Sequence, residues 1–180
     1  MAVCGTKTHY GAVAQALHWV TAILVVVAFA YGPGGSEQRV YSASKDFDRQ
    51  VHETLGISVF LLALLRLAWR AFDAQPEDPP MPRWMSLASK AVHATLYLLL
   101  LMVPLTAISG AWLEGHPLTF PGQVRVGPLL PEVHNLGKAI ASIHTWLGDA
   151  ILWIAGVHAV AALYHHFVLR DRVLRSMLPG

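Results

Sequence analysis

The chain has 180 residues, of which 54% are hydrophobic and only 13% are charged. A soluble globular domain carries about a quarter charged residues, so this composition excludes an ordinary water-soluble fold and predicts an integral membrane protein. The net charge of +2 gives no reason to expect nucleic acid as a partner. The single cysteine, Cys4, excludes a disulfide within one chain, and the lack of a Cys-x-x-Cys-His motif excludes covalently attached c-type haem.

Four apolar stretches are long enough to cross the roughly 30 Å hydrocarbon core of a bilayer, which takes about 20 helical residues. Gly-rich and Pro-rich segments separate them and predict loops, the longest of which covers residues 114–137. The first stretch exceeds the apolar region of a signal peptide, about 7–15 residues, so we expect it to be retained. The sequence therefore predicts an all-α fold, a four-helix transmembrane bundle forming one domain, with spans at about 11–31, 50–72, 88–113 and 138–167.

The Lys and Arg residues are unevenly divided between the two ends of these spans. Four spans place both termini on one side, and that side carries eight of the 13 basic residues. The positive-inside rule therefore predicts that both termini are cytoplasmic. The eight residues are Lys7, Arg66, Arg70, Arg83, Lys90, Arg170, Arg172 and Arg175.

Histidine is unusually frequent, with ten residues, although an imidazole is costly to bury in lipid. Four histidines form two pairs by depth: His18 with His158 toward the cytoplasm, and His52 with His144 toward the outside. His144 and His158 are 14 residues apart. In a helix this interval is about 21 Å along the axis and only about 40° around it. Both histidines therefore face the same side of the bundle at different depths.

Two imidazoles at equal depth on different helices are the ligand set of low-spin haem b, a one-electron carrier. The two pairs therefore predict two haem b groups, one near each face. His52 and His144 are each followed four residues later by a glycine, Gly56 or Gly148, on the same helix face. Without a side chain there, a macrocycle could lie close to the backbone. The competing interpretation of any single histidine is a hydrogen bond between helices.

Six motifs extend over most of the chain: ALHW at 16–19, VHETLGI at 51–57, LLRLAWR at 64–70, VHATLYLLLLMVPLTAISG at 92–110, HTWLG at 144–148 and GVHAVAALYHHF at 156–167. With these motifs the chain resembles the bacterial cytochrome b561 family, small four-helix dihaem proteins of the inner membrane. The resemblance implies that His18, His52, His144 and His158 are the axial ligands of the haem irons.

The resemblance is to superoxide-oxidising members in particular. It implies an oxidoreductase that takes electrons from superoxide on the periplasmic side and reduces ubiquinone. The alternative is a non-catalytic electron-transfer subunit that links a partner redox enzyme to the quinone pool. A third hypothesis is a histidine-lined metal transporter, although Asp149 and Glu53 are the few carboxylates that the spans offer it.

Three further residues at the inner side are candidate site residues. His165, about 10 Å nearer the cytoplasm than His158, is a candidate proton donor to a quinone, because imidazole titrates near neutral pH. Arg66 and Arg70 are candidates for pairing with haem propionates, since guanidinium binds carboxylate bidentately. Both also fit ordinary positive-inside anchors. His93 is expected to bond to another helix or to contact a haem edge.

Overall fold

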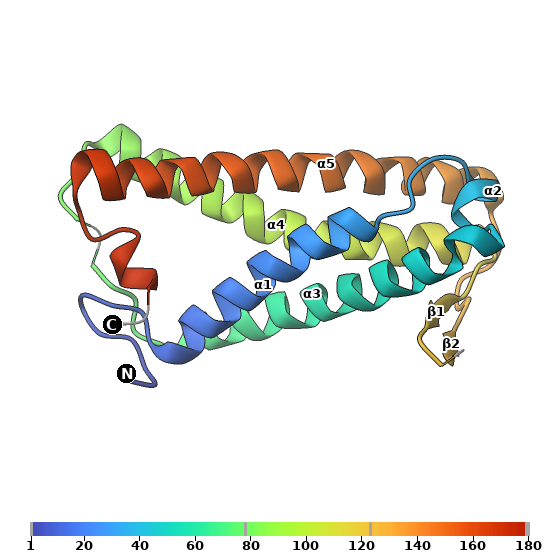
Figure 1. Cartoon of the computed structure of the whole chain (residues 1–180), viewed down its shortest axis with the longest axis horizontal. Helices are drawn as coiled ribbons and strands as arrows, with labels where there is room; N and C mark the ends of the chain where they lie inside the picture. Colours follow the sequence, from blue (N-terminus) through green and yellow to red (C-terminus); the bar gives the residue numbers. More distant parts are fainter. Residues whose placement is uncertain (1, 78, 123, 179–180) are drawn as a thin grey trace.

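The computed structural model describes residues 2–77, 79–122 and 124–178. Four long helices run the length of an elongated bundle (Figure 1). With their flanking turns, all four are long and apolar enough to cross a membrane. The predicted all-α four-helix transmembrane bundle is confirmed, and its helices are α1 (Ala12–Tyr31), α3 (Asp46–Phe72), α4 (Arg83–Leu113) and α5 (His134–Tyr164).

The connections hold more regular structure than the loops we predicted for them. Two short helices, α2 (Glu37–Val40) and η1 (Ala43–Lys45), connect α1 to α3. An antiparallel hairpin of β1 (Leu118–Phe120) and β2 (Val124–Val126) lies between α4 and α5. After α5 the chain forms a π-helical turn, η2 (His165–Leu169), and a 3-10 turn, η3 (Arg175–Met177).

Three helices begin four or five residues before the predicted spans, because polar first turns extend them beyond the apolar stretches. The first turn of α3 holds Asp46 and Asp48, whose negative charges favour the positive end of the helix dipole. The start of α4 directly follows Pro82, a residue type whose fixed φ suits the beginning of a helix. Apolar length therefore marks the membrane-crossing part of each helix and underestimates its full extent.

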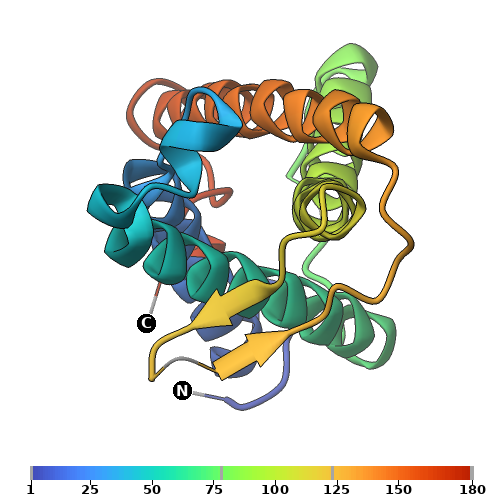
Figure 2. The same cartoon turned by 90° about the vertical axis from the view of Figure 1, so that its right-hand side faces the viewer.

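The helices pack mainly as two antiparallel pairs, α1 with α3 and α4 with α5, which Figure 2 shows end-on. A small core joins the two pairs and consists of Val59, Ala63, Leu99, Leu100 and Ile151. On α5, Ile151 lies midway between the two predicted ligand histidines of that helix. The core therefore occupies the middle of the bundle and leaves the histidines on either side of it along the axis.

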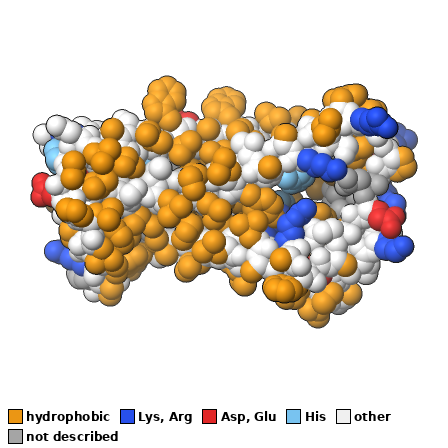
Figure 3. Space-filling view, turned by 180° about the vertical axis from the view of Figure 1, so that it is seen from behind, with side chains coloured by type: hydrophobic (Ala, Val, Ile, Leu, Met, Phe, Trp, Pro, Cys, Tyr) orange, Lys and Arg blue, Asp and Glu red, His pale blue; other side chains and the backbone are white. Residues whose placement is uncertain are grey.

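Large apolar side chains cover the outside of the bundle. Phe72, Trp146 and Trp153 are 90%, 75% and 78% exposed. Figure 3 shows the bundle from behind the view of Figure 1. Hydrophobic side chains cover the middle of this face, and Lys and Arg gather toward the end that holds the termini. Soluble monomers rarely expose so large a contiguous apolar surface, whereas a lipid environment requires one.

The two terminal segments lie together at one end of the bundle (Figure 1). The amide of Gln15 in α1 donates hydrogen bonds to the carbonyls of Tyr10, Ser176 and Leu178. The backbone N–H of Tyr10 also donates to the carbonyl of Ser176. These bonds hold both segments against the start of α1 and form a cap at this end.

Candidate functional site

The structure brings His52 of α3 and His144 of α5 together at the end opposite the termini. We name this end the outer end and the end with the termini the inner end, after the orientation predicted from the sequence. Their ring centroids are 5.9 Å apart and the rings are nearly perpendicular, at 82°. Nδ1 of His52 donates to the carbonyl of Ala28 at 2.7 Å, and Nδ1 of His144 donates to that of Val103 at 2.9 Å. Because a carbonyl can only accept, Nδ1 carries the proton in each ring and Nε2 keeps its lone pair. Such a second bond fixes the ring orientation of metal-ligating histidines.

The two acceptor carbonyls differ in their places along the helices. Ala28 is in the last turn of α1, where carbonyls lose their partners within the helix. The N–H of Gly32 bonds to Phe29 instead, and leaves the Ala28 carbonyl for His52. Val103 lies inside α4, and its carbonyl also accepts from the hydroxyl of Thr106 at 2.9 Å. A free carbonyl at the end of α1 and a shared carbonyl within α4 therefore orient the two imidazoles.

An apolar cavity lies between these two histidines, with an empty volume of ≈ 780 Å³ that is partly open to the surroundings. All four long helices and β1 contribute to its walls. Gly56 and Gly148 both line it, and a Cβ placed at either glycine would meet no atom within 4 Å. Both glycines therefore border open space beside the imidazoles.

The inner pair is also brought together: the rings of His18 in α1 and His158 in α5 have centroids 6.4 Å apart at an angle of 85°. Nδ1 of His18 is buried and has no hydrogen-bond partner among the described residues. Buried polar atoms are nearly always satisfied, so this nitrogen fits a site that a bound group completes.

The separations within the two pairs suit a metal ion between the rings. Two metal–nitrogen bonds of about 2 Å place the nitrogens about 4 Å apart, and each ring centre lies about 1 Å further back, about 6 Å in all. The observed 5.9 Å and 6.4 Å match this sum. The donor chemistry, the cavity and the spacing therefore all fit haem b held by two imidazoles.

His93 of α4 lies beside the inner pair, with its ring centroid 5.0 Å from that of His158. Its Nδ1 donates to the carbonyl of Ser89, one turn earlier in the same helix, at 2.7 Å. This bond is within α4, and the interhelical bond or haem-edge contact expected of His93 from the sequence stays a prediction. A centroid separation of 5.0 Å is about 1 Å shorter than two metal bonds require.

The two inner arginines differ in their surroundings. Arg66 is half-buried, and its guanidinium lies over the ring of Tyr97 at 5.4 Å from the centroid. Its charge acts on both His18 and His158, and no acidic side chain of the described residues pairs with it. Arg70 is exposed. Arg66 is therefore the better placed of the two for an acidic group on a ligand of the inner pair.

His165 lies at the inner end of α5, where the helix gives way to the π-helical turn. Its Nδ1 and Oδ2 of Asp171 are 2.5 Å apart, and Oδ1 of Asp171 accepts the N–H of Val173 at 2.9 Å. Arg170, with a left-handed φ of 55°, turns the chain so that Asp171 reaches back to the ring. Sequence reasoning did not identify Asp171, because a carboxylate six residues away meets a histidine only through this turn.

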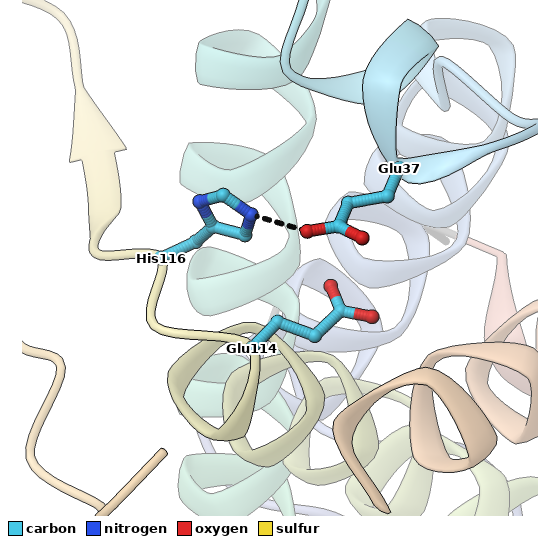
Figure 4. A group of neighbouring side chains, drawn as sticks. All are labelled: Glu37, Glu114 and His116. Carbon is cyan, nitrogen blue, oxygen red and sulfur yellow. Dashed lines mark hydrogen bonds and ion pairs between the residues drawn. The ribbon is translucent and has the colours of Figure 1, made fainter. Parts of the chain in front are cut away.

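Sequence reasoning also missed a cluster at the outer end, formed by Glu37 of α2, Glu114 after α4 and His116 before β1 (Figure 4). Nε2 of His116 lies 2.9 Å from Oε1 of Glu37, and this hydrogen bond lowers the pKa of Glu37. Burial, together with the charge of Glu37, raises the pKa of Glu114. No spacing pattern could reveal the cluster, because the fold joins segments almost 80 residues apart.

Comparison with known proteins identifies the family. A model of prokaryotic cytochrome b561 matches residues 9–180. The chain belongs to this family. The resemblance inferred from the motifs is thereby confirmed, and membership implies haem b binding and electron transfer in a membrane. With its four membrane-length helices, this cytochrome b561 family member is an integral protein of the bacterial inner membrane.

Three relatives of this family member align over nearly their whole length. Cytochrome b561 homolog 2 of Escherichia coli K12 is 28% identical over 99% of this chain and 95% of its own. Cytochrome b561 homolog 1 of the same strain is 31% identical over 91% of this chain and 93% of its own. A probable superoxide oxidase of Yersinia pestis is 26% identical over 94% of this chain and 96% of its own.

Proposed function

We propose that this cytochrome b561 family member holds two haem b groups and transfers electrons across the inner membrane from periplasmic superoxide to ubiquinone. The observation that carries the proposal is the presence of two facing histidine pairs, with ring centroids 5.9 Å and 6.4 Å apart. Two superoxide anions, one ubiquinone and two protons give two dioxygen molecules and one ubiquinol. The name of the Yersinia pestis relative supports superoxide as the donor.

Haem b held by two imidazoles supplies a low-spin one-electron carrier. In our proposal His52 and His144 are the axial ligands of the outer site, and His18 and His158 are those of the inner site. The carbonyls of Ala28 and Val103 hold the outer imidazoles with Nε2 free to ligate. The walls around them are mainly apolar.

The inner end has a basic residue and a titratable residue for the rest of the reaction. Arg66, with Arg70 one helical turn further on, is proposed to pair with haem propionates. His165 is proposed to donate a proton to the quinone, because its imidazole lies near the cytoplasmic end. Asp171 holds that imidazole in position through Nδ1 and leaves Nε2 to face a substrate. The proposal places both termini in the cytoplasm, in agreement with the excess of basic residues at that end.

The outer glycines are expected to be essential for the outer site. In Gly148→Leu the new side chain enters the cavity beside His144, and we expect the outer haem to be lost while the inner one stays. Leucine favours a helix over glycine by about 1 kcal/mol, so the helix itself is not weakened. Haem per chain, measured by pyridine haemochrome, checks this.

Gly156→Leu is the matched control, because Gly156 is on the same helix, has no atom within 4 Å of an added Cβ and does not line the cavity. It should retain the full haem content. Equal haem content in the two variants would contradict the proposal that the outer haem lies against the backbone at Gly148.

The donor and the acceptor can be tested on the purified protein. Superoxide generated enzymatically from dioxygen should reduce the bound haems, seen as a b-type α-band, and added ubiquinone should reoxidise them. Superoxide dismutase in the same mixture should abolish the reduction. Haems that ascorbate or dithionite reduces but superoxide does not would reject superoxide as the donor and leave haem binding intact.

An electron-transfer subunit without a substrate of its own is the second candidate function. The outer end favours it in one respect, because the acidic cluster of Glu37 and Glu114 disfavours an approaching anion. In addition, Arg49 is already paired with Asp46 and Glu53. A redox partner that co-purifies stoichiometrically with the chain from its native membrane would support this function over superoxide oxidation.

A further inference from the structure

The cluster at the outer end has the donor set of a metal site that is separate from the two histidine pairs. Glu37, Glu114 and His116 each offer one ligand atom, and these atoms all lie within 4.8 Å of one another. Figure 4 shows the three side chains converging on one point from α2 and from the connection that follows α4. His134 is the nearest further donor, with Nε2 3.4 Å from Oε2 of Glu37.

Glu114 is the residue that needs an explanation. It is nine-tenths buried, with only 9% of its surface exposed, and its side chain is directed at Glu37 and His116. Among the described residues, its carboxylate makes no hydrogen bond and no ion pair within 4 Å. A largely buried carboxylate that makes no hydrogen bond and lies beside a second carboxylate gains little from its surroundings, and a cation would compensate both charges.

The backbone at Glu114, just after α4, packs closely against the start of α5. A Cβ added to Gly137 of α5 would lie 2.7 Å from Cγ of Glu114 and 2.8 Å from its backbone nitrogen. Only glycine therefore lets the end of α4 lie this close to α5. The Cγ of Glu114 therefore packs against Gly137.

The groups already near the cluster do not satisfy it. Lys138 Nζ lies 3.6 Å from Oε2 of Glu37, but its side chain is 55% exposed, and an exposed lysine pair adds little stability. His116 is hydrogen-bonded to Glu37 and stacked on the ring of Tyr41, with centroids 3.5 Å apart. This stacking holds the imidazole edge-on toward the two carboxylates.

We propose that Glu37, Glu114 and His116 bind one divalent transition-metal cation of the Zn²⁺ class at the outer end of the bundle. Carboxylate oxygen with imidazole nitrogen is a ligand set that Zn²⁺ accepts at about 2.0–2.2 Å. Mg²⁺ and Ca²⁺ prefer oxygen ligands alone, so the histidine selects against them. The three residues close on the ion by small side-chain rotations, and the bond between His116 and Glu37 is replaced by bonds to the metal.

The cation would join α2 to the connection between α4 and β1, which carries both Glu114 and His116. Tyr41, stacked on His116, also lies under the guanidinium of Arg49 at 5.2 Å. Arg49 bonds to Glu53, which lines the outer cavity. The bound ion would thus stabilise the rim of that cavity and neutralise its acidic charge. The inference does not depend on the proposed electron donor or acceptor.

Equilibrium dialysis tests the site. The detergent-purified protein, with its bound cofactors and after EDTA treatment, is dialysed against graded Zn²⁺, and bound zinc is measured by elemental analysis. We expect about one Zn²⁺ per chain and, for Glu114→Gln and for His116→Ala, affinity at least about tenfold weaker, the least that loss of a supporting partner costs. A hundredfold excess of Mg²⁺ should not displace the zinc.

Two control variants test whether the loss of a histidine elsewhere, or the change of net charge alone, would account for weaker zinc binding. Glu132→Gln makes the same charge change nearby, since Oε2 of Glu132 lies 3.3 Å from an added Cβ on Gly115. His9→Ala removes an exposed imidazole at the other end. Both should bind zinc as the unaltered protein does, and Zn²⁺ should raise the unfolding temperature of these two but not of Glu114→Gln. Absence of zinc binding, or equal binding in Glu114→Gln, would overturn the proposal.

Discussion

Replacing His52 or His144 with alanine is expected to lower the haem content of the purified protein from about two per chain to about one. The imidazoles of this pair are held by carbonyls of α1 and α4, and no other histidine of the described residues lines the cavity, so alanine removes a ligand that is not replaced. The inner pair lies on the other side of the Ile151 core and makes no contact with this site. The remaining haem should therefore keep its spectrum and its midpoint potential.

The measurement combines pyridine haemochrome quantification with a redox titration of the α-band. The unaltered protein should titrate in two steps and each variant in one, and the remaining step should be the same for His52→Ala and His144→Ala. His9→Ala, at an exposed position, is the control and should keep both steps. Loss of both haems from each variant, in protein that still elutes as a folded species, would argue against the pairing of His52 with His144.

Replacing His18 with alanine is expected to remove the inner haem, whereas replacing His93 should leave it bound. Three imidazoles surround this site, and geometry decides between them. His18 and His158 have ring centroids 6.4 Å apart, which accommodates two metal bonds, while 5.0 Å between His93 and His158 does not. The Nδ1 of His18 is also buried without a partner, whereas that of His93 is bonded to Ser89.

Haem content and the low-spin signal in electron paramagnetic resonance distinguish the two histidines. His18→Ala should lose one of the two low-spin signals, and His93→Ala should keep both with at most a small change in the inner potential. His158→Ala provides the internal standard, since it should behave as His18→Ala does. Retention of the inner haem in His18→Ala together with its loss in His93→Ala would show that His93 is the ligand.

The family, the number of spans and the identity of the paired histidines could all be predicted from the sequence. A helix that crosses the bilayer needs about 20 mostly apolar residues with all backbone groups bonded inside the helix. Each segment meets this requirement by itself, so it can be recognised from the sequence. The interval from His144 to His158 could be converted to depth and direction because both residues are on one straight helix. Pairing across helices followed from depth alone, because the bilayer orders all four spans along one axis.

The features that sequence reasoning missed depend on contacts between distant segments. Sequence reasoning had no means of showing that the carbonyl of Ala28 is free to orient His52, or that Asp171 turns back to His165. Helix starts were placed too late in α3, α4 and α5, because their first turns are polar and do not resemble a membrane span. Segment 114–137 contains a hairpin, where Pro and Gly residues predicted only a loop.

Hydrophobic patterning and histidine spacing alone therefore determined a four-span bundle with an imidazole pair near each end. The tertiary structure decided which nitrogen of His52 and of His144 stays available, where open space lies beside Gly148, and that Glu114 meets Glu37 and His116 at the rim. The reason is physical: burial in lipid acts on each segment by itself, whereas hydrogen bonds, cavities and metal-ligand clusters require atoms from several segments within a few ångströms.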